Sequence, residues 1–105
     1  NLEDDIDGYS FRLPKTNIQM CEIGTSLHNC VARYAENVEN KKCTIVYVTK
    51  DGEYKICIEA SRNKIMQERI DRNAHPTDEE KAVLAKWHER HGLNVSYKDY
   101  DDIPF

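Results

Sequence analysis

Cys30 is the side chain in this sequence best suited to covalent chemistry, because two histidines could assist it. A cysteine attacks as a thiolate, which a nearby base or positive charge populates at neutral pH. His28 lies two positions away in an expected helix, about 200° around the axis, whereas His75, oriented by Asn73, comes from another element. One hypothesis is therefore a small hydrolase or transferase with the catalytic candidates Cys30, His28 and His75. The helical pattern favours the competing interpretation, a buried core cysteine.

A second group of polar side chains exceeds what a small apolar core requires. His28 and Tyr34 belong to the expected helix, and Gln67, Arg69 and Asn73 to a later strand and its following loop. If they converge, they could bind a ligand. They could equally form a buried hydrogen-bond network that fixes the helix to the sheet, since buried polar groups normally satisfy one another. The sequence leaves both interpretations open.

Four basic residues suggest a polyanionic partner: Arg62, Lys64, Arg69 and Arg72. The net charge of −4 does not exclude one, because the acids gather at the two ends. Residues 1–8 hold four acids and residues 99–102 hold three, which leaves 15 bases against 12 acids between them. We predict a nucleic-acid contact at these four residues.

Metal and membrane sites find little support. His28, Cys30, Cys43 and His75 could be imagined as ligands, but no spacing is typical of a metal site, so we expect no metal and no cofactor. No run approaches the ~18 apolar residues of a membrane span, and the opening residues do not resemble a signal peptide. We expect a cytoplasmic protein, no membrane contact and four reduced cysteines. The oligomeric state is open.

The elements that must position these residues begin with a helix at about 26–40, with Thr25 or Ser26 as N-cap. Its apolar residues have the spacing of one helical face: Leu27, Cys30, Val31, Tyr34, Ala35 and Val38. The segment 18–23 before it fits either a short strand or a helical turn.

A β-hairpin should follow, with strands 43–49 and 54–60 joined around Asp51-Gly52. Pairing Lys50 with Glu53 predicts a register of Tyr47 opposite Ile56, Ile45 opposite Ile58, Cys43 opposite Ala60 and Val46 opposite Cys57. Ile45, Tyr47, Ile56 and Ile58 would then share the buried face, with Cys43 and Cys57 on opposite faces.

A third strand is expected at 64–71. It is unusually polar on both faces: Gln67 and Arg69 would share one face with Ile65, and Glu68 would share the other with Met66 and Ile70.

The final helix is the clearest element in the sequence. Thr77 and Glu80 form a capping box, and the helix should run from Asp78 to about His91 and end at Gly92. Its apolar stripe is Val83, Leu84 and Trp87, while His88 and His91 suit the negative end of the helix dipole.

Together these elements predict an α+β domain, a three-stranded antiparallel meander packed on one face by two helices, with an N-terminal strand or arm. We divide the 105 residues into an acidic flexible arm (1–8), one domain (9–92) and an extended tail (93–105).

The order of motifs resembles the PcfJ-like proteins of conjugative plasmids, phages and other mobile elements. The matching residues span about 20–91 and are Leu27, His28, Cys30, Val31 and Tyr34, then Gln67, Arg69, Asn73, Pro76, Thr77 and Trp87. The resemblance implies an accessory domain of a mobile-element protein that binds nucleic acid or a protein partner. A small enzyme and a pure protein-interaction module remain the alternatives.

Overall fold

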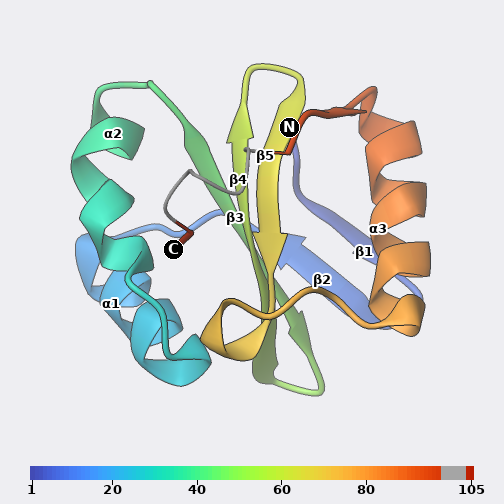
Figure 1. Cartoon of the computed structure of the whole chain (residues 1–105), viewed down its shortest axis with the longest axis horizontal. Coiled ribbons are helices and arrows are strands. Elements are labelled where there is room, and N and C mark those ends of the chain that lie inside the picture. Colours follow the sequence, from blue (N-terminus) through green and yellow to red (C-terminus); the bar gives the residue numbers. More distant parts are fainter. Residues whose placement is uncertain (98–103) are drawn as a thin grey trace.

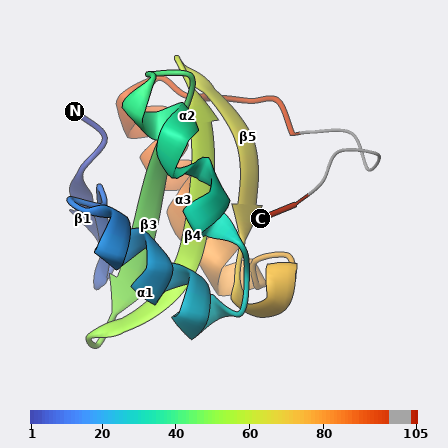
Figure 2. The same cartoon turned by 90° about the vertical axis from the view of Figure 1, so that its left-hand side faces the viewer.

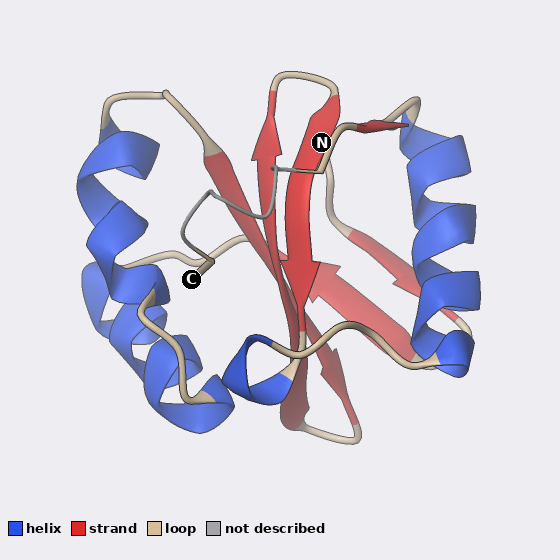
Figure 3. Ribbon diagram, in the orientation of Figure 1, coloured by secondary structure: helices blue, strands red, loops and turns tan. Residues whose placement is uncertain are grey.

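The fold has three layers, with helices on both faces of one sheet (Figures 1 and 3). A computed structural model describes residues 1–97 and 104–105. The strands lie in chain order, and all neighbours are antiparallel except the last pair, which is parallel. They are β1 (Asp4–Ile6), β2 (Tyr9–Arg12), β3 (Thr44–Lys50), β4 (Glu53–Ser61), β5 (Lys64–Arg69) and β6 (Asn94–Val95).

Three α-helices and two 3₁₀ turns complete the described part: α1 (Asn17–Leu27), η1 (Val31–Tyr34), α2 (Ala35–Glu39), η2 (Asp71–Asn73) and α3 (Asp78–His91). The α+β class is confirmed. The three-stranded meander with both helices on one face is wrong, because α1 and α2 cover one face and α3 the other (Figure 1). Residues 1–8, expected to be an arm, contain β1.

The first helix ends where the sequence predicted a start. Thr16 is its N-cap and accepts a hydrogen bond from the Gln19 backbone at 3.0 Å. His28 ends it in the left-handed conformation, with φ 53°. Gly24 lies inside this helix. A Cβ there would be 3.0 Å from the carbonyl oxygen of Asn29, so the close approach of the turn favours glycine at this position. The expected continuous helix at 26–40 is therefore wrong. The apolar residues keep helical spacing through residues 28–30, where the helix is in fact interrupted, so their spacing does not reveal the interruption.

The hairpin has the predicted turn but a different register. Asp51 and Gly52 take positive φ, and Lys50 pairs with Glu53. An irregularity between Val48 and Thr49 then shifts the pairing by one residue, so that Val48 faces Ile56 and Tyr47 faces Cys57. The predicted pairing of Tyr47 with Ile56 is therefore wrong.

This shift redistributes the apolar side chains between two cores. Ile56 and Ile58 pack with Val46 and Val48 on the α3 side, whereas Ile45 packs with buried cysteines on the α1 side. Because helices cover both faces, both faces of β3 and β4 are apolar, and alternation no longer identifies one buried face. Cys43 and Cys57, expected on opposite faces, are both buried in the same core.

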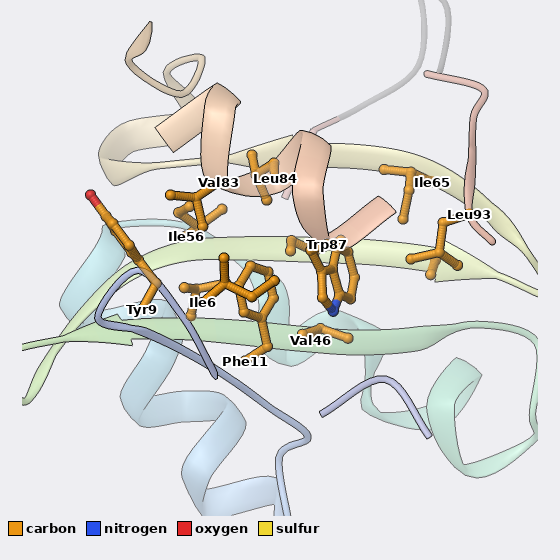
Figure 4. Close-up of a cluster of buried hydrophobic side chains, with 13 residues drawn as sticks. Ile6, Tyr9, Phe11, Val46, Ile56, Ile65, Val83, Leu84, Trp87 and Leu93 are labelled. Atoms are coloured by element: carbon orange, nitrogen blue, oxygen red, sulfur yellow. The ribbon is translucent and has the colours of Figure 1, made fainter. Parts of the chain in front are cut away.

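The core under α3 contains Trp87, which is fully buried (Figure 4). Its ring stacks on Phe11 of β2 at a centroid distance of 4.7 Å, and its indole N–H donates to the Leu2 carbonyl. The N-terminal hairpin is therefore part of the core. The capping box at Thr77 and Glu80, the helix bounds, the Gly92 end and the stripe of Val83, Leu84 and Trp87 are confirmed.

Strand β5 ends at Arg69 rather than at residue 71. A second irregularity, between Glu59 and Ala60, places Gln67 opposite Glu59 and Ile65 opposite Ala60. Ile65 therefore packs in the α3-side core, away from Gln67, and the predicted shared face is wrong.

The predicted tail is structured where it is described. Leu93 is buried and β6 follows it, while residues 98–103 lie outside the described part. No helix within residues 1–97 and 104–105 has the length and apolar character that crossing a membrane requires.

Candidate functional site

The three catalytic candidates do not form a triad. Cys30, expected in the core, is exposed, because the left-handed turn at His28 ends the helix before it. The His28 ring contacts a different residue: its Nδ1 lies 2.6 Å from Oδ1 of Asp71. His75 is exposed in the loop before α3. Within the described residues, no hydrogen bond joins the Cys30 thiol to either ring.

The second polar group converges only in part. Gln67 is 3% exposed, and its Nε2 donates to Oε1 of Glu59 at 2.8 Å and to the Tyr34 hydroxyl at 3.3 Å. A carboxylate only accepts hydrogen bonds, so the amide nitrogen of Gln67 must face Glu59. Gln67 thereby connects η1 to the sheet, as the network interpretation expected.

Beside this network, Asn73 binds the end of the described chain. Its Nδ2 donates to the Phe105 carbonyl at 2.7 Å, and the Phe105 ring lies edge-on to Tyr34 at 5.3 Å. Arg69 donates to the Asn73 carbonyl at 3.2 Å. Tyr34, Gln67, Arg69 and Asn73 thus form one connected group, whereas His28 pairs with Asp71 in η2.

A cavity of about 530 Å³ opens on the other side of β5, between this strand and α3. It has a charged centre that the sequence analysis did not predict. Glu68 is 4% exposed, and its carboxylate lies 2.6 Å from Nε2 of His88. The Tyr97 hydroxyl donates to the other carboxylate oxygen at 2.8 Å. Burial and the charge of Glu68 raise the pKa of Tyr97.

Nitrogen-bearing side chains dominate the rest of the polar lining. Arg69, His75 and Lys81 join His88, and Glu68 is the only carboxylate among the described residues that line the cavity. Apolar side chains supply much of the remaining wall: Met66, Pro76, Leu84, Ala85 and Val95. Such a cavity favours a ligand that combines an apolar body with negative charge.

The sequence contained one signal for this site. The polarity of both faces of β5 places Glu68 beside apolar residues, but the sequence explains its partner His88 only as a favourable residue at the helix C-terminus. The pairing required the position of α3 over β5, which sequence spacing does not give. His88 and Glu68 are 20 positions apart.

The four basic residues predicted to bind nucleic acid lie towards two ends of β5. Arg62 lies in the turn between β4 and β5 and Lys64 begins β5, whereas Arg69 ends the strand and Arg72 lies in η2. Only Arg69 of these four lines the cavity. Arg72 lies 3.6 Å from the Asp71 carboxylate. The cavity offers a different basic set, built around Arg69 and Lys81.

Within the described residues, no three His, Cys, Asp or Glu side chains are grouped to bind a metal. The family model described as PcfJ-like protein matches residues 1–84. No curated protein matches the chain, and no solved structure does.

Proposed function

Because this chain belongs to the PcfJ-like protein family, we propose that it is an accessory domain of a plasmid or phage protein. Its proposed role is binding, and the proposed ligand is single-stranded nucleic acid held at the cavity between β5 and α3.

One observation carries this proposal: the charge arrangement of the cavity lining. Arg69 and Lys81 offer two cationic groups at the cavity. The carboxylate of Glu68 already accepts from Tyr97 and contacts His88, so part of its charge is compensated within the protein. Among the described lining residues, an anionic ligand therefore meets more attraction than repulsion.

The aromatic edge of the cavity favours a single strand. Tyr97 lines the cavity and is 57% exposed, which leaves its ring available for stacking on a base. A cavity of about 530 Å³ lies within the size range of small-ligand sites and could take an unpaired nucleotide. The bases of a duplex are stacked inside and cannot enter without being extruded. Phosphates on either side of the bound nucleotide would contact Arg69 and Lys81.

The experiment is a titration of fluorescent single- and double-stranded DNA and RNA at several salt concentrations. Wild type should bind the single strands more tightly, and binding should weaken as salt rises. The variant Arg69→Ala/Lys81→Ala should bind more weakly and show a smaller salt dependence, since it removes two charges from the cavity.

The variant Arg62→Ala/Lys64→Ala is a charge-matched control, because it removes two cations outside the cavity. It should bind nearly as well as wild type. An equal loss in both variants would assign the effect to net charge, and absence of binding by wild type at low salt would contradict the proposal. A thermal melt of each variant excludes unfolding as the cause.

A further inference from the structure

The cavity between β5 and α3 is lined by a histidine that a buried carboxylate orients. Nε2 of His88 lies 2.6 Å from Oε2 of Glu68, and the Tyr97 hydroxyl donates to the other carboxylate oxygen. A carboxylate only accepts hydrogen bonds, so Nε2 of His88 must carry its hydrogen. In the neutral ring, the lone pair that can take a proton is therefore on Nδ1. Within residues 1–97 and 104–105, no hydrogen bond is made to this Nδ1.

A histidine held by a carboxylate in this way is the arrangement of a general base. The carboxylate selects the tautomer and stabilises the imidazolium that forms when the ring takes a proton. The Glu68 side chain is 1% exposed and cannot contact a ligand itself, whereas the His88 side chain is 14% exposed. His88 is therefore the member of the pair that a ligand in the cavity can reach.

The cavity supplies this base with no protein nucleophile. Among the described residues that line it there is no serine, threonine or cysteine. Burial and the charge of Glu68 raise the pKa of Tyr97, which disfavours its phenolate. The segment between α1 and η1, which carries the exposed Cys30, lies across the sheet from α3 (Figures 1 and 2). The nucleophile must therefore come from the ligand or from water.

The cationic side chains of the cavity are suited to a phosphodiester. Lys81 lies two turns before His88 on the same face of α3, with Leu84 between them, and all three line the cavity. Arg69 contributes a second cation from β5. Two cations at a reacting phosphate stabilise the negative charge that develops on its oxygens in the transition state.

We propose that this cavity cleaves single-stranded RNA, with His88 as the general base for a ribose 2′-hydroxyl. RNA carries this hydroxyl beside each phosphate, so it brings its own nucleophile. Nδ1 of His88 takes the hydroxyl proton, and the 2′ oxygen forms a bond to the adjacent phosphorus. The bond between phosphorus and the 5′ oxygen of the next nucleotide breaks. That oxygen takes a proton from solvent, and His88 returns to solvent the proton it accepted.

The products of this step are a 2′,3′-cyclic phosphate and a 5′-hydroxyl. Glu68 is a positioning residue, because it acts through His88. The inference rests on the proposed binding of single-stranded nucleic acid at the same cavity, and it names RNA as the substrate there.

The experiment compares a fluorescent single-stranded RNA of mixed sequence with the same strand fully 2′-O-methylated, in buffer containing EDTA. Wild type should bind both strands, cleave only the RNA and leave the cyclic phosphate, which mass spectrometry identifies. The rate should rise from acid to neutral pH as the base loses its proton. His88→Gln should lower the rate by about 10²–10⁴-fold and abolish this rise. Its binding of the methylated strand should fall far less, since a glutamine amide can still donate to Glu68.

Glu68→Gln tests the positioning role. Tyr97 would still donate to the amide oxygen, so the amide N–H would face Nε2 of His88 and the ring hydrogen would move to Nδ1. The cleavage rate should fall at least about tenfold, with little loss of binding, because the base is then in the wrong tautomer.

His91→Gln is the matched control. His91 lies on the same helix and its Nε2 contacts a carboxylate oxygen of Asp4 at 2.9 Å, but it does not line the cavity. This variant should cleave at the wild-type rate. The wild-type comparison of the two strands needs no variant, so it tests the inference even if a variant does not fold.

Three results would overturn this inference and leave the proposed binding intact: RNA that binds but stays whole, cleavage of the methylated strand, or equal cleavage rates in wild type and His88→Gln. Absence of binding to both strands would contradict the proposed function as well.

Discussion

At the scale of single residues, backbone conformation decides which side chains are available for chemistry. Cys30 fits an apolar helical face on spacing, yet the left-handed turn at His28 directs the chain out of α1 and leaves Cys30 exposed. Glu68 shows the opposite: a carboxylate on a strand becomes a buried group because His88 and Tyr97 reach it. Three of the four histidines contact a carboxylate within the described residues: His28, His88 and His91.

This arrangement predicts a specific pattern of cysteine labelling. In the native protein, a thiol reagent should modify Cys21 and Cys30, which are exposed, and should spare Cys43 and Cys57. Burial raises the pKa of Cys57 and further disfavours its reactive thiolate. Peptide mass mapping after brief labelling would measure this.

The same labelling tests the thiol-enzyme hypothesis. His75→Ala and His28→Ala should leave the rate of Cys30 modification unchanged, because neither ring is hydrogen-bonded to the thiol within the described residues. A large decrease in that rate in either variant would instead support the hypothesis of a cysteine-dependent enzyme.

At the scale of elements, α1 and the turn after it act as one unit. The Asn29 N–H donates to the Gly24 carbonyl at 2.9 Å, and the Asn29 side chain accepts from the Val31 N–H at 3.0 Å. This compact turn connects α1 to η1, which carries Arg33 and Tyr34. The positions of Arg33 and Tyr34 therefore depend on how tightly the turn packs over Gly24.

Gly24→Ala should lower stability for this reason. In an ordinary helix interior, Gly→Ala stabilises by about 1 kcal/mol. Here the new Cβ would lie 3.0 Å from the Asn29 carbonyl oxygen, so the turn must shift. Ser26→Ala, an exposed change in the same helix, is the control and should have a small or slightly stabilising effect. Denaturant unfolding of both variants measures the difference, and a stabilised Gly24→Ala would contradict the close packing.

At the scale of the whole molecule, one sheet serves two cores. The α3 side contains the Phe11 and Trp87 stack, and the α1 side contains Ile45, the two buried cysteines and Phe105. Strand β5 contributes to both sides of the sheet, since Glu68 lines the cavity under α3 and Gln67 donates a hydrogen bond to Tyr34 of η1. Adjacent residues of one strand thus serve opposite faces.

The two-core arrangement predicts that large-to-small changes on both faces are destabilising. Ile58→Ala, under α3, and Ile45→Ala, under α1, should each lower the free energy of unfolding by about 2–5 kcal/mol, because each side chain is buried against a helix layer. Chemical denaturation monitored by Trp87 fluorescence and by circular dichroism measures both. A negligible loss from either change would mean that one face is not a packed core.

Local chemistry in the sequence was sufficient to predict the family resemblance, the α+β class, the hairpin turn at Asp51-Gly52 and the complete outline of α3. These features depend on neighbouring residues: a capping box, a glycine C-cap and a two-residue turn each lie within a few positions. The residues that determine each of these features therefore lie within the same short stretch of sequence.

Tertiary structure decided the rest. The register of β3 and β4 depends on a local irregularity, and alternation cannot locate it when helices cover both faces. The end of α1 depends on packing between Gly24 and Asn29, which cannot be predicted from the spacing of apolar residues. The pairing of Glu68 with His88 requires α3 to lie over β5, and the burial of Phe105 requires the chain end to return to Tyr34. Both contacts join residues far apart in the chain, so only the folded molecule brings them together.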